Sequence, residues 1–284
     1  MQSGGESFLP VHPVSECMQI HQLGEGQPEL AVVAGIHGDE PSGVEAIERL
    51  VADDPAVERP VKLIIANEEA LEAGERFLEE DLNRAFPGDS DGDTHESRLA
   101  HELAREVQGC TVLALHSTQS YAEPIAVIDT VDEIARSLAP LLPVDVLIET
   151  DNHTDGRLIE HAHTIELECG LQGTDEAAEN AYWLTRSFLS ATNALSVPVS
   201  DDRLAQPGRD EVQVFRLDGP IAKPPGREYD VVVPNFERVE AGERFALADG
   251  EALTADEPFY PVLLSAEGYD DIFGYAAEAV GTIE

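Results

Sequence analysis

One short turn limits the folds that this chain can adopt. The apolar run Leu30–Ala34 is rich in β-branched residues and stops at Gly35, so we expect a buried strand followed by a tight turn. The segment from Pro41 to Val51 then has the pattern of a helix. A strand, a glycine-rich turn and a helix in this order are typical of an α/β sheet.

The turn itself carries two side chains that can bind a metal ion. His37 and Glu40 lie three positions apart, and Gly35 and Gly38 let the backbone bend tightly, so an imidazole and a carboxylate can converge on one cation. The pattern is short, and it would also suit a turn with a helix-capping acid and a surface histidine. It therefore predicts half of a zinc site, which the rest of the chain has to complete.

A third ligand candidate is His116. A second strand is predicted at Val61–Asn67 and a third at Thr111–His116, and their short connections favour a βαβ unit. In open α/β sheets ligands bind at the carboxyl ends of strands, although a histidine there can also be satisfied by a backbone group. Two histidines and a glutamate would leave one position open, which is the usual arrangement of a catalytic zinc.

Two carboxylates in a later strand are candidates for a catalytic base. Strand alternation over His163–Gly170 puts Glu166 and Glu168 on one face. In so acidic a protein this face could instead point to water at the edge of the sheet. Glu168 lies nearer the carboxyl end of the strand, so we favour it as the base. A shift of two residues in the strand register would exchange the two.

Net charge excludes several classes of partner. The chain has 284 residues and a formal net charge of −40, which argues against nucleic acid and against anionic membranes. This charge repels itself at low ionic strength, so we expect a protein adapted to salt. No apolar run approaches the roughly 20 residues of a membrane span, and Met1–Pro10 lacks the pattern of a signal peptide. We therefore expect a cytoplasmic protein.

The sequence pattern changes near residue 200. Before it, strands and helices alternate, including a helix to about Val107 with Asp93 and Glu96 as a capping box. After it, short alternating stretches separated by proline and glycine predict a small all-β unit. We expect an α/β domain over 1–200 and a β domain over 201–284. The remaining predicted elements are Ile125–Ile128, Val131–Leu142, Val144–Glu149, Thr174–Asn193, Val212–Leu217, Tyr229–Val233, Arg244–Ala248 and Phe259–Leu264.

Four motifs occur in an order that resembles a known enzyme family. They are Gly35-Ile36-His37-Gly38-Asp39-Glu40, Asp81-Leu82-Asn83-Arg84, the strand that ends in His116, and Glu168-Cys169-Gly170. Nearly end to end, the chain resembles the succinylglutamate desuccinylase and aspartoacylase family of zinc carboxypeptidase-like amidohydrolases. The C-terminal part looks most like aspartoacylase, through Pro234-Asn235-Phe236, Ala241-Gly242-Glu243 and Tyr260-Pro261-Val262. Phe86-Pro87-Gly88, in contrast, is similar to the wider deacylase relatives.

This resemblance implies a mixed-sheet carboxypeptidase-like fold whose β domain covers the active site. It implies one zinc ion per chain, bound by His37, Glu40 and His116. It also implies that Glu168 is the general base and that Arg76 polarises the scissile carbonyl. The implied substrate binders are Asn83, Arg84, Tyr269 and Arg157, the last one residue out of register with an arginine of the family. The arginines could instead form surface salt bridges, and the tyrosine could simply pack.

The predicted function is zinc-dependent hydrolysis of the amide bond of a small N-acyl amino acid, which yields a carboxylate and a free amino acid. Two alternatives are a deacetylase of another N-acetylated amino acid and a metallocarboxypeptidase that cuts peptides. A third is a non-catalytic protein that binds a metal or an anion at the Gly35–Glu40 turn. The predicted partner is a small molecule, and the resemblance is compatible with a homodimer.

Overall fold

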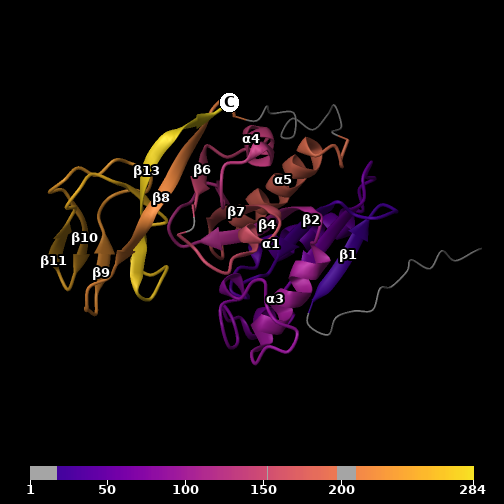
Figure 1. Ribbon diagram of the computed structural model, residues 1–284, viewed down its shortest axis with the longest axis horizontal. Helices are drawn as coiled ribbons and strands as arrows, with labels where there is room; N and C mark the ends of the chain where they lie inside the picture. Colours follow the sequence, from indigo (N-terminus) through magenta and orange to yellow (C-terminus); the bar gives the residue numbers. More distant parts are fainter. Residues whose placement is uncertain (1–17, 152, 197–208) are drawn as a thin grey trace, which may run out of the picture.

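The computed structural model of the chain describes residues 18–151, 153–196 and 209–284. The predictions for Met1–Pro10 and for a boundary near residue 200 lie outside these ranges. Within them, ten strands form one mixed sheet and three form a smaller antiparallel sheet. The small sheet, β9 to β11, lies at the opposite end of the molecule from strand β1 (Figure 1).

The large sheet places several strand ends together. β2, β3, β4 and β7 pair in parallel, so their carboxyl ends meet at one edge, as the α/β prediction requires. In spatial order the strands are β1 (Gln19–Leu23), β3 (Val61–Ile65), β2 (Leu30–Ala34), β4 (Thr111–Thr118), β7 (His163–Leu171), β5 (Ile125–Ile128), β6 (Val146–Glu149), β8 (Val212–Ala222), β13 (Ile272–Ile283) and β12 (Tyr260–Val262). The small sheet contains β11 (Glu251–Thr254), β10 (Arg244–Ala248) and β9 (Tyr229–Val231).

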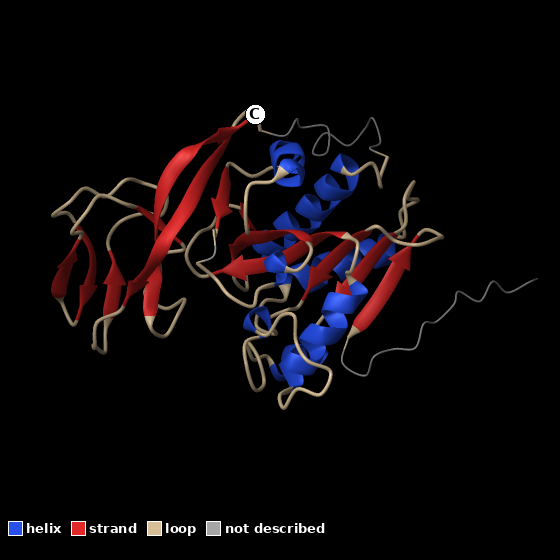
Figure 2. Ribbon diagram, viewed as in Figure 1, coloured by secondary structure: helices blue, strands red, loops and turns tan. Residues whose placement is uncertain are grey.

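Helices cover both faces of the large sheet (Figure 2). Val32 of β2 packs in one apolar core with α1, α4 and α5, whereas the next residue, Val33, packs in a second core with α3. This alternation explains why the whole of β2 is apolar, because both of its faces are buried. The helices are α1 (Ser42–Asp53), α2 (Glu68–Ala73), α3 (His95–Glu106), α4 (Glu133–Leu138) and α5 (Asp175–Ala191), with short 3-10 turns η1 (Leu82–Arg84), η2 (Ala139–Leu141) and η3 (Leu158–Glu160).

The start of α3 differs from the prediction. Asp93 and Glu96 do not form a capping box. Thr94 is the N-cap, and its side chain accepts a hydrogen bond from the Ser97 backbone N–H. Glu96 is fully buried and bonds to another segment of the chain. The predicted helix over 131–142 is shorter, since α4 changes to the 3-10 turn η2 around Pro140.

Three strands and one helix were not predicted. β1 is mostly exposed and polar, and α2 contains three glutamates and two alanines around a single leucine, so neither has a strong apolar period. β11 has no buried residue, and β13 is exposed over residues 278–282. β1 and β13 depend on pairing with the distant strands β3 and β8, which a local pattern does not record.

The C-terminal region is joined to the α/β part through the large sheet. β8 pairs with β6 in parallel, with Leu147 opposite Val214, and β13 runs antiparallel along β8. Only β9 to β11 form a separate sheet, and an apolar core that includes Phe245, Ala246 and Phe273 lies beside it. The region predicted to be a small β unit is therefore partly a continuation of the large sheet.

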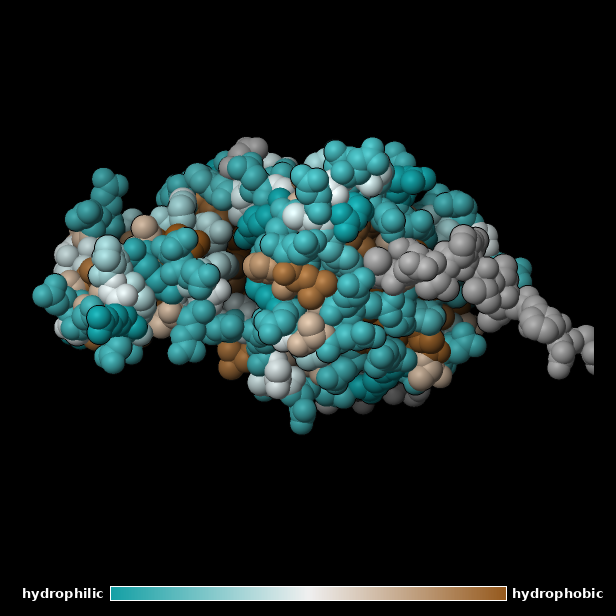
Figure 3. All heavy atoms as spheres, turned by 90° about the horizontal axis from the view of Figure 1, so that it is seen from below, coloured by the Kyte–Doolittle hydropathy of each residue, from teal (hydrophilic) through white to brown (hydrophobic). Residues whose placement is uncertain are grey.

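The surface is mostly hydrophilic (Figure 3), as the high content of acidic residues predicts. Figure 3 shows a face that is hydrophilic over most of its area, with a few separate apolar patches. Among the described residues, no helix is long and apolar enough to cross a membrane.

Candidate active site

All nine predicted site residues line one cavity at the carboxyl end of the parallel strands. Its enclosed space is about 50 Å³, so the cavity is narrow. The residues come from seven separate parts of the chain, which explains why no short motif contains them. They are His37 and Glu40 after β2, Arg76 after α2, Asn83 and Arg84 in η1, His116 in β4, Arg157 before η3, Glu168 in β7, and Tyr269 between β12 and β13.

The glycine-rich turn after β2 has its shape for steric reasons. Gly35 adopts a φ of +67°, which an L side chain rarely allows. A Cβ on Gly38 would lie 2.2 Å from the carbonyl carbon of Ala70, so the turn packs directly against the α2 backbone. The Gly38 N–H also donates to the Arg76 carbonyl oxygen at 3.2 Å. The turn is thereby fixed with His37 and Glu40 directed into the cavity.

His37, Glu40 and His116 form a cluster that suits a divalent cation. His37 Nδ1 lies 2.8 Å from Glu40 Oε1, and His116 Nδ1 lies 3.0 Å from Glu40 Oε2. All three residues are buried, and their ligand atoms lie within 4.8 Å of one another. In the described ranges no other cluster of this kind is present. Two imidazole nitrogens and a carboxylate oxygen match a zinc donor set with an open position.

Asp81 was not predicted as a site residue, yet it contacts a metal-ligand candidate. Its Oδ1 lies 3.0 Å from His37 Nε2, the nitrogen that faces away from Glu40. A carboxylate on the second nitrogen fixes the tautomer and orientation of a ligating histidine. Burial alone would lower the pKa of His37, but Glu40 and Asp81 raise it to about 9. The signal in the sequence was its place in the same motif as Asn83 and Arg84.

Glu168 faces the cavity from the strand next to His116. It is opposite His116 in the register of β4 and β7, and its Oε2 is buried without a hydrogen-bond partner in the described part of the chain. Withdrawal from water raises the pKa of Glu168 to about 7, with Glu40 and Glu166 adding to the effect. A carboxylate with this pKa can both accept and return a proton near neutral pH.

Glu166 has different surroundings from Glu168. It is 1% exposed, and it forms an ion pair with Arg157. The Asn83 side-chain amide donates to Glu166 Oε1 at 3.1 Å and accepts a hydrogen bond from the Leu158 N–H at 3.1 Å. Burial alone would raise the pKa of Glu166, but Arg157, His116 and Asn83 hold it below its ordinary value. The geometry therefore separates the two carboxylates that the sequence could not distinguish.

Arg84 and Tyr269 complete the cavity wall. The Arg84 guanidinium donates to the Asn83 carbonyl oxygen at 2.7 Å, and it forms no ion pair within the described residues. Tyr269 packs edge to face on Tyr275, with ring centroids 6.2 Å apart, and burial raises its pKa. Because Tyr269 comes from the loop before β13, the C-terminal region contributes directly to the cavity.

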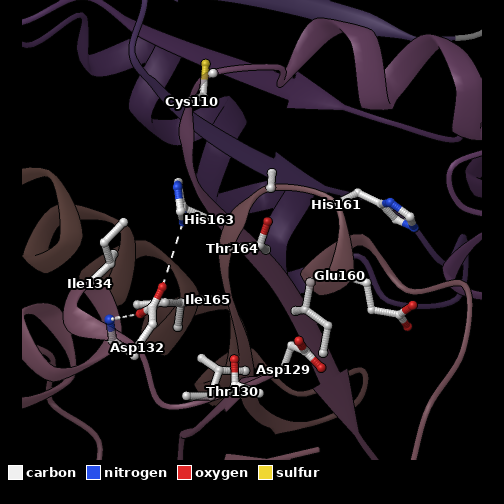
Figure 4. Close-up of a pocket in the computed structure, with 15 residues that line it drawn as sticks. Cys110, Asp129, Thr130, Asp132, Ile134, Glu160, His161, His163, Thr164 and Ile165 are labelled. Carbon is white, nitrogen blue, oxygen red and sulfur yellow. Dashed lines mark hydrogen bonds and ion pairs between the residues drawn. The ribbon is translucent and has the colours of Figure 1, made fainter. Parts of the chain in front are cut away.

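A second cavity of about 460 Å³ lies at the other end of β4 and β7 and contains none of the predicted residues. Figure 4 shows Asp132 between His163, at 3.8 Å, and the Ala135 N–H of α4, at 2.8 Å. The carboxyl groups of Asp129 and Glu160 also line it. Asp132 and Glu160 serve as caps of short helices, and the cavity holds no cluster of metal-ligand candidates among the described residues, so the narrower cavity is the better candidate for an active site.

Comparisons with known proteins identify the family to which the chain is similar. The family model described as the succinylglutamate desuccinylase/aspartoacylase catalytic domain matches residues 26–174. A succinylglutamate desuccinylase of Pseudomonas paraeruginosa is 33% identical over 123 residues, and the match covers 37% of each protein, little more than a third of that relative's length. A probable aspartoacylase of Nostoc sp. is 23% identical over 277 residues, covering 84% of this chain and 92% of that protein.

The fold agrees as well. The crystal structure of a succinylglutamate desuccinylase/aspartoacylase from Rhodobacter sphaeroides superposes with a TM-score of 0.73 at 18% identity. The superposition covers 92% of this chain and 89% of that one, so the C-terminal region is included in the shared architecture.

Proposed function

The chain belongs to the succinylglutamate desuccinylase/aspartoacylase family, and on this basis we propose that it is an enzyme that hydrolyses the amide bond of a small N-acyl amino acid. The products would be a carboxylate and a free amino acid. One observation carries the proposal: a buried carboxylate oxygen, Glu168 Oε2, has no hydrogen-bond partner among the described residues and shares a narrow cavity with the His37, Glu40 and His116 cluster. The names of the relatives support the same class of reaction.

Zinc is the proposed cofactor, with one ion per chain. His37, Glu40 and His116 would hold it, and their donor atoms fit it because they converge within 4.8 Å. When bound, zinc would polarise a carbonyl oxygen and lower the pKa of a water molecule to about 7. Asp81 would keep the His37 ring in position through the hydrogen bond to Nε2.

Glu168 is the proposed general base. Its carboxylate would take the proton from the attacking water and then deliver it to the departing amine. Its position in the cavity, with an unpartnered Oε2 and a raised pKa, supports both steps. Glu166 is less suited to this role, since both of its oxygens already accept hydrogen bonds within the protein.

The arginines would bind negative charge. Arg76 reaches Glu40 at 3.0 Å while 39% of its side chain stays exposed, so it can donate to the oxyanion that forms on the scissile carbonyl. Losing one such donor typically raises the barrier by about 3 kcal/mol. Arg84 can hold a carboxylate of the substrate with two parallel hydrogen bonds, and Asn83 and Tyr269 line the same space.

The narrow cavity favours a small substrate over a peptide. Tyr269 and Leu263 from the C-terminal region form part of its wall, which leaves little room for a polypeptide. We therefore favour an acyl amino acid hydrolase over a metallocarboxypeptidase.

Elemental analysis of protein purified in high salt, combined with a substrate panel, tests the proposal. The panel is N-acetylaspartate, N-succinylglutamate, N-acetyldiaminobutyrate and a dipeptide. We expect about one zinc per chain and turnover of one acyl amino acid, which a chelator abolishes. Absence of bound metal after reconstitution would contradict the metal site. Bound metal without turnover of any panel member would instead favour a non-catalytic binding protein.

A further inference from the structure

Three guanidinium groups line the active-site cavity, and two of them already have acidic partners. Arg76 pairs with Glu40 at 3.0 Å and with Asp81 at 3.5 Å. Arg157 pairs with Glu166. Arg84 forms no ion pair within the described residues, although it lines the same cavity. The cavity thus offers one guanidinium that forms no direct ion pair among the described residues, although its charge acts on Asp81 and Glu166 from a longer distance.

The pair of Arg157 and Glu166 is built into the interior. Arg157 is 8% exposed and Glu166 is 1% exposed. The second oxygen of Glu166 accepts from Asn83 at 3.1 Å, and Glu160 accepts from the Arg157 backbone N–H at 3.1 Å. Breaking a buried ion pair leaves an uncompensated charge and is strongly unfavourable. A substrate carboxylate therefore competes poorly with Glu166 for Arg157.

From this arrangement we propose that Glu166 is a positioning residue that selects substrates by charge. It neutralises Arg157 from inside the protein, so the site accepts an N-acyl amino acid with one carboxylate, held by Arg84, in preference to one with two. This inference rests on the proposed function and narrows its substrate class. It predicts a higher kcat/KM for N-acylated amino acids with a neutral side chain than for acyl aspartates and acyl glutamates.

Two ligands of nearly equal shape test the proposal, namely N-acetylasparagine and N-acetylaspartate. We expect wild-type kcat/KM to be higher for N-acetylasparagine. Glu166→Gln removes one negative charge and frees Arg157, so kcat/KM for N-acetylaspartate should rise about tenfold, the equivalent of one charge-assisted hydrogen bond. The value for N-acetylasparagine should change much less. Partial unfolding cannot produce a selective gain of this kind.

Matched variants separate the charge effect from a structural one. Glu160 also contacts Arg157, but it accepts a hydrogen bond only from the Arg157 backbone N–H. In Glu160→Gln the ratio of kcat/KM for the two substrates should therefore stay as in the wild type. The double variant Glu166→Gln/Arg157→Gln should lose the gain seen with Glu166→Gln. A gain that persists without Arg157 would overturn the proposal.

Binding measurements keep the inference independent of turnover. In a Glu168→Gln background, calorimetry should show tighter binding of N-acetylasparagine than of N-acetylaspartate. Adding Glu166→Gln should reduce or reverse this difference. Equal or tighter binding of N-acetylaspartate to the protein with Glu166 intact would refute the inference. Selective binding without hydrolysis by the wild type would refute only the proposed function.

Discussion

Glu168 sets the expected pH dependence of the reaction. Its pKa is raised to about 7, so the base is protonated and inactive in acid. Log kcat/KM should therefore rise with a slope of about one per pH unit up to pH 7 and then level off. A pH series in buffers of constant salt measures this directly.

Glu168→Gln should remove that acidic limb and lower kcat by about 10²- to 10⁴-fold. Bound metal, measured by elemental analysis, should stay unchanged because Glu168 is not part of the ligand cluster. If the limb persists in the variant, a group other than Glu168 sets it, and a zinc-bound water with a pKa of about 7 is the first alternative.

Asp81 should affect metal affinity rather than substrate affinity. Asp81→Asn weakens the acceptor on His37 Nε2, so the ring is held less firmly and zinc affinity should fall about 10- to 100-fold. Competition with a chelator of known affinity measures the change. Asp91→Asn, at an exposed position in a nearby turn, is the control and should bind zinc as the wild type does. Equal zinc affinity in both variants would show that Asp81 does not orient His37.

The sequence named candidate site residues but not their relations to one another. All nine line one cavity. Strand ends and a glycine-rich turn suggested the two histidines and two glutamates, whereas the resemblance to the family implied the other five. The contact of Asp81 with His37 spans 44 positions, and that of Asn83 with Glu166 spans 83. Such hydrogen bonds depend on how segments pack, so the sequence alone could not choose between Glu166 and Glu168.

At the scale of elements, α3 has a role beyond packing. Glu96, in its first turn, accepts hydrogen bonds from the backbone N–H groups of Leu78, Glu79 and Glu80, the closest at 2.7 Å. This segment connects Arg76 to Asp81, two residues that contact His37 or Glu40. α3 therefore holds the loop that positions both of them.

Glu96→Ala should destabilise the protein and lower activity together. Three backbone N–H groups lose a charged, buried acceptor, which we expect to reduce the free energy of unfolding by about 3 kcal/mol. Urea denaturation in high salt and kcat at saturating substrate check the two effects. Arg105→Ala, at an exposed position of the same helix, should change neither. Full activity in Glu96→Ala would show that the loop keeps its shape without this anchor.

Helix ends illustrate what local sequence can decide. The prediction placed the capping box at Asp93 and Glu96, but Thr94 caps α3. Aspartate and threonine are both common N-cap residues, so the local sequence allows either. Glu96 is buried and bonded to the 78–80 loop, so it cannot close a capping box with Asp93. The strand and helix around the Gly35–Glu40 turn were predicted correctly, because β2 is a continuous apolar run and α1 has a strong apolar period.

At the scale of the whole molecule, net charge should control stability. A formal charge of −40 on 284 residues repels itself over distances that salt screens, about 10 Å at 0.1 M and 3 Å at 1 M. The melting temperature should therefore rise clearly between 0.1 M and 1 M KCl. Sucrose is the control, because it is excluded from the protein surface and stabilises folded proteins without screening charge. Equal melting temperatures at both KCl concentrations would contradict the expected adaptation to salt.

The pairing of β8 with β6 has a consequence for how ligands reach the cavity. Since the C-terminal region continues the large sheet, a rigid-body rotation about a hinge would have to break the ladder between these two strands. The wall formed by Leu263 and Tyr269, in contrast, belongs to a loop between β12 and β13. Ligand exchange is thus expected to follow loop motion, in nanoseconds to microseconds, and not the slower opening of two domains.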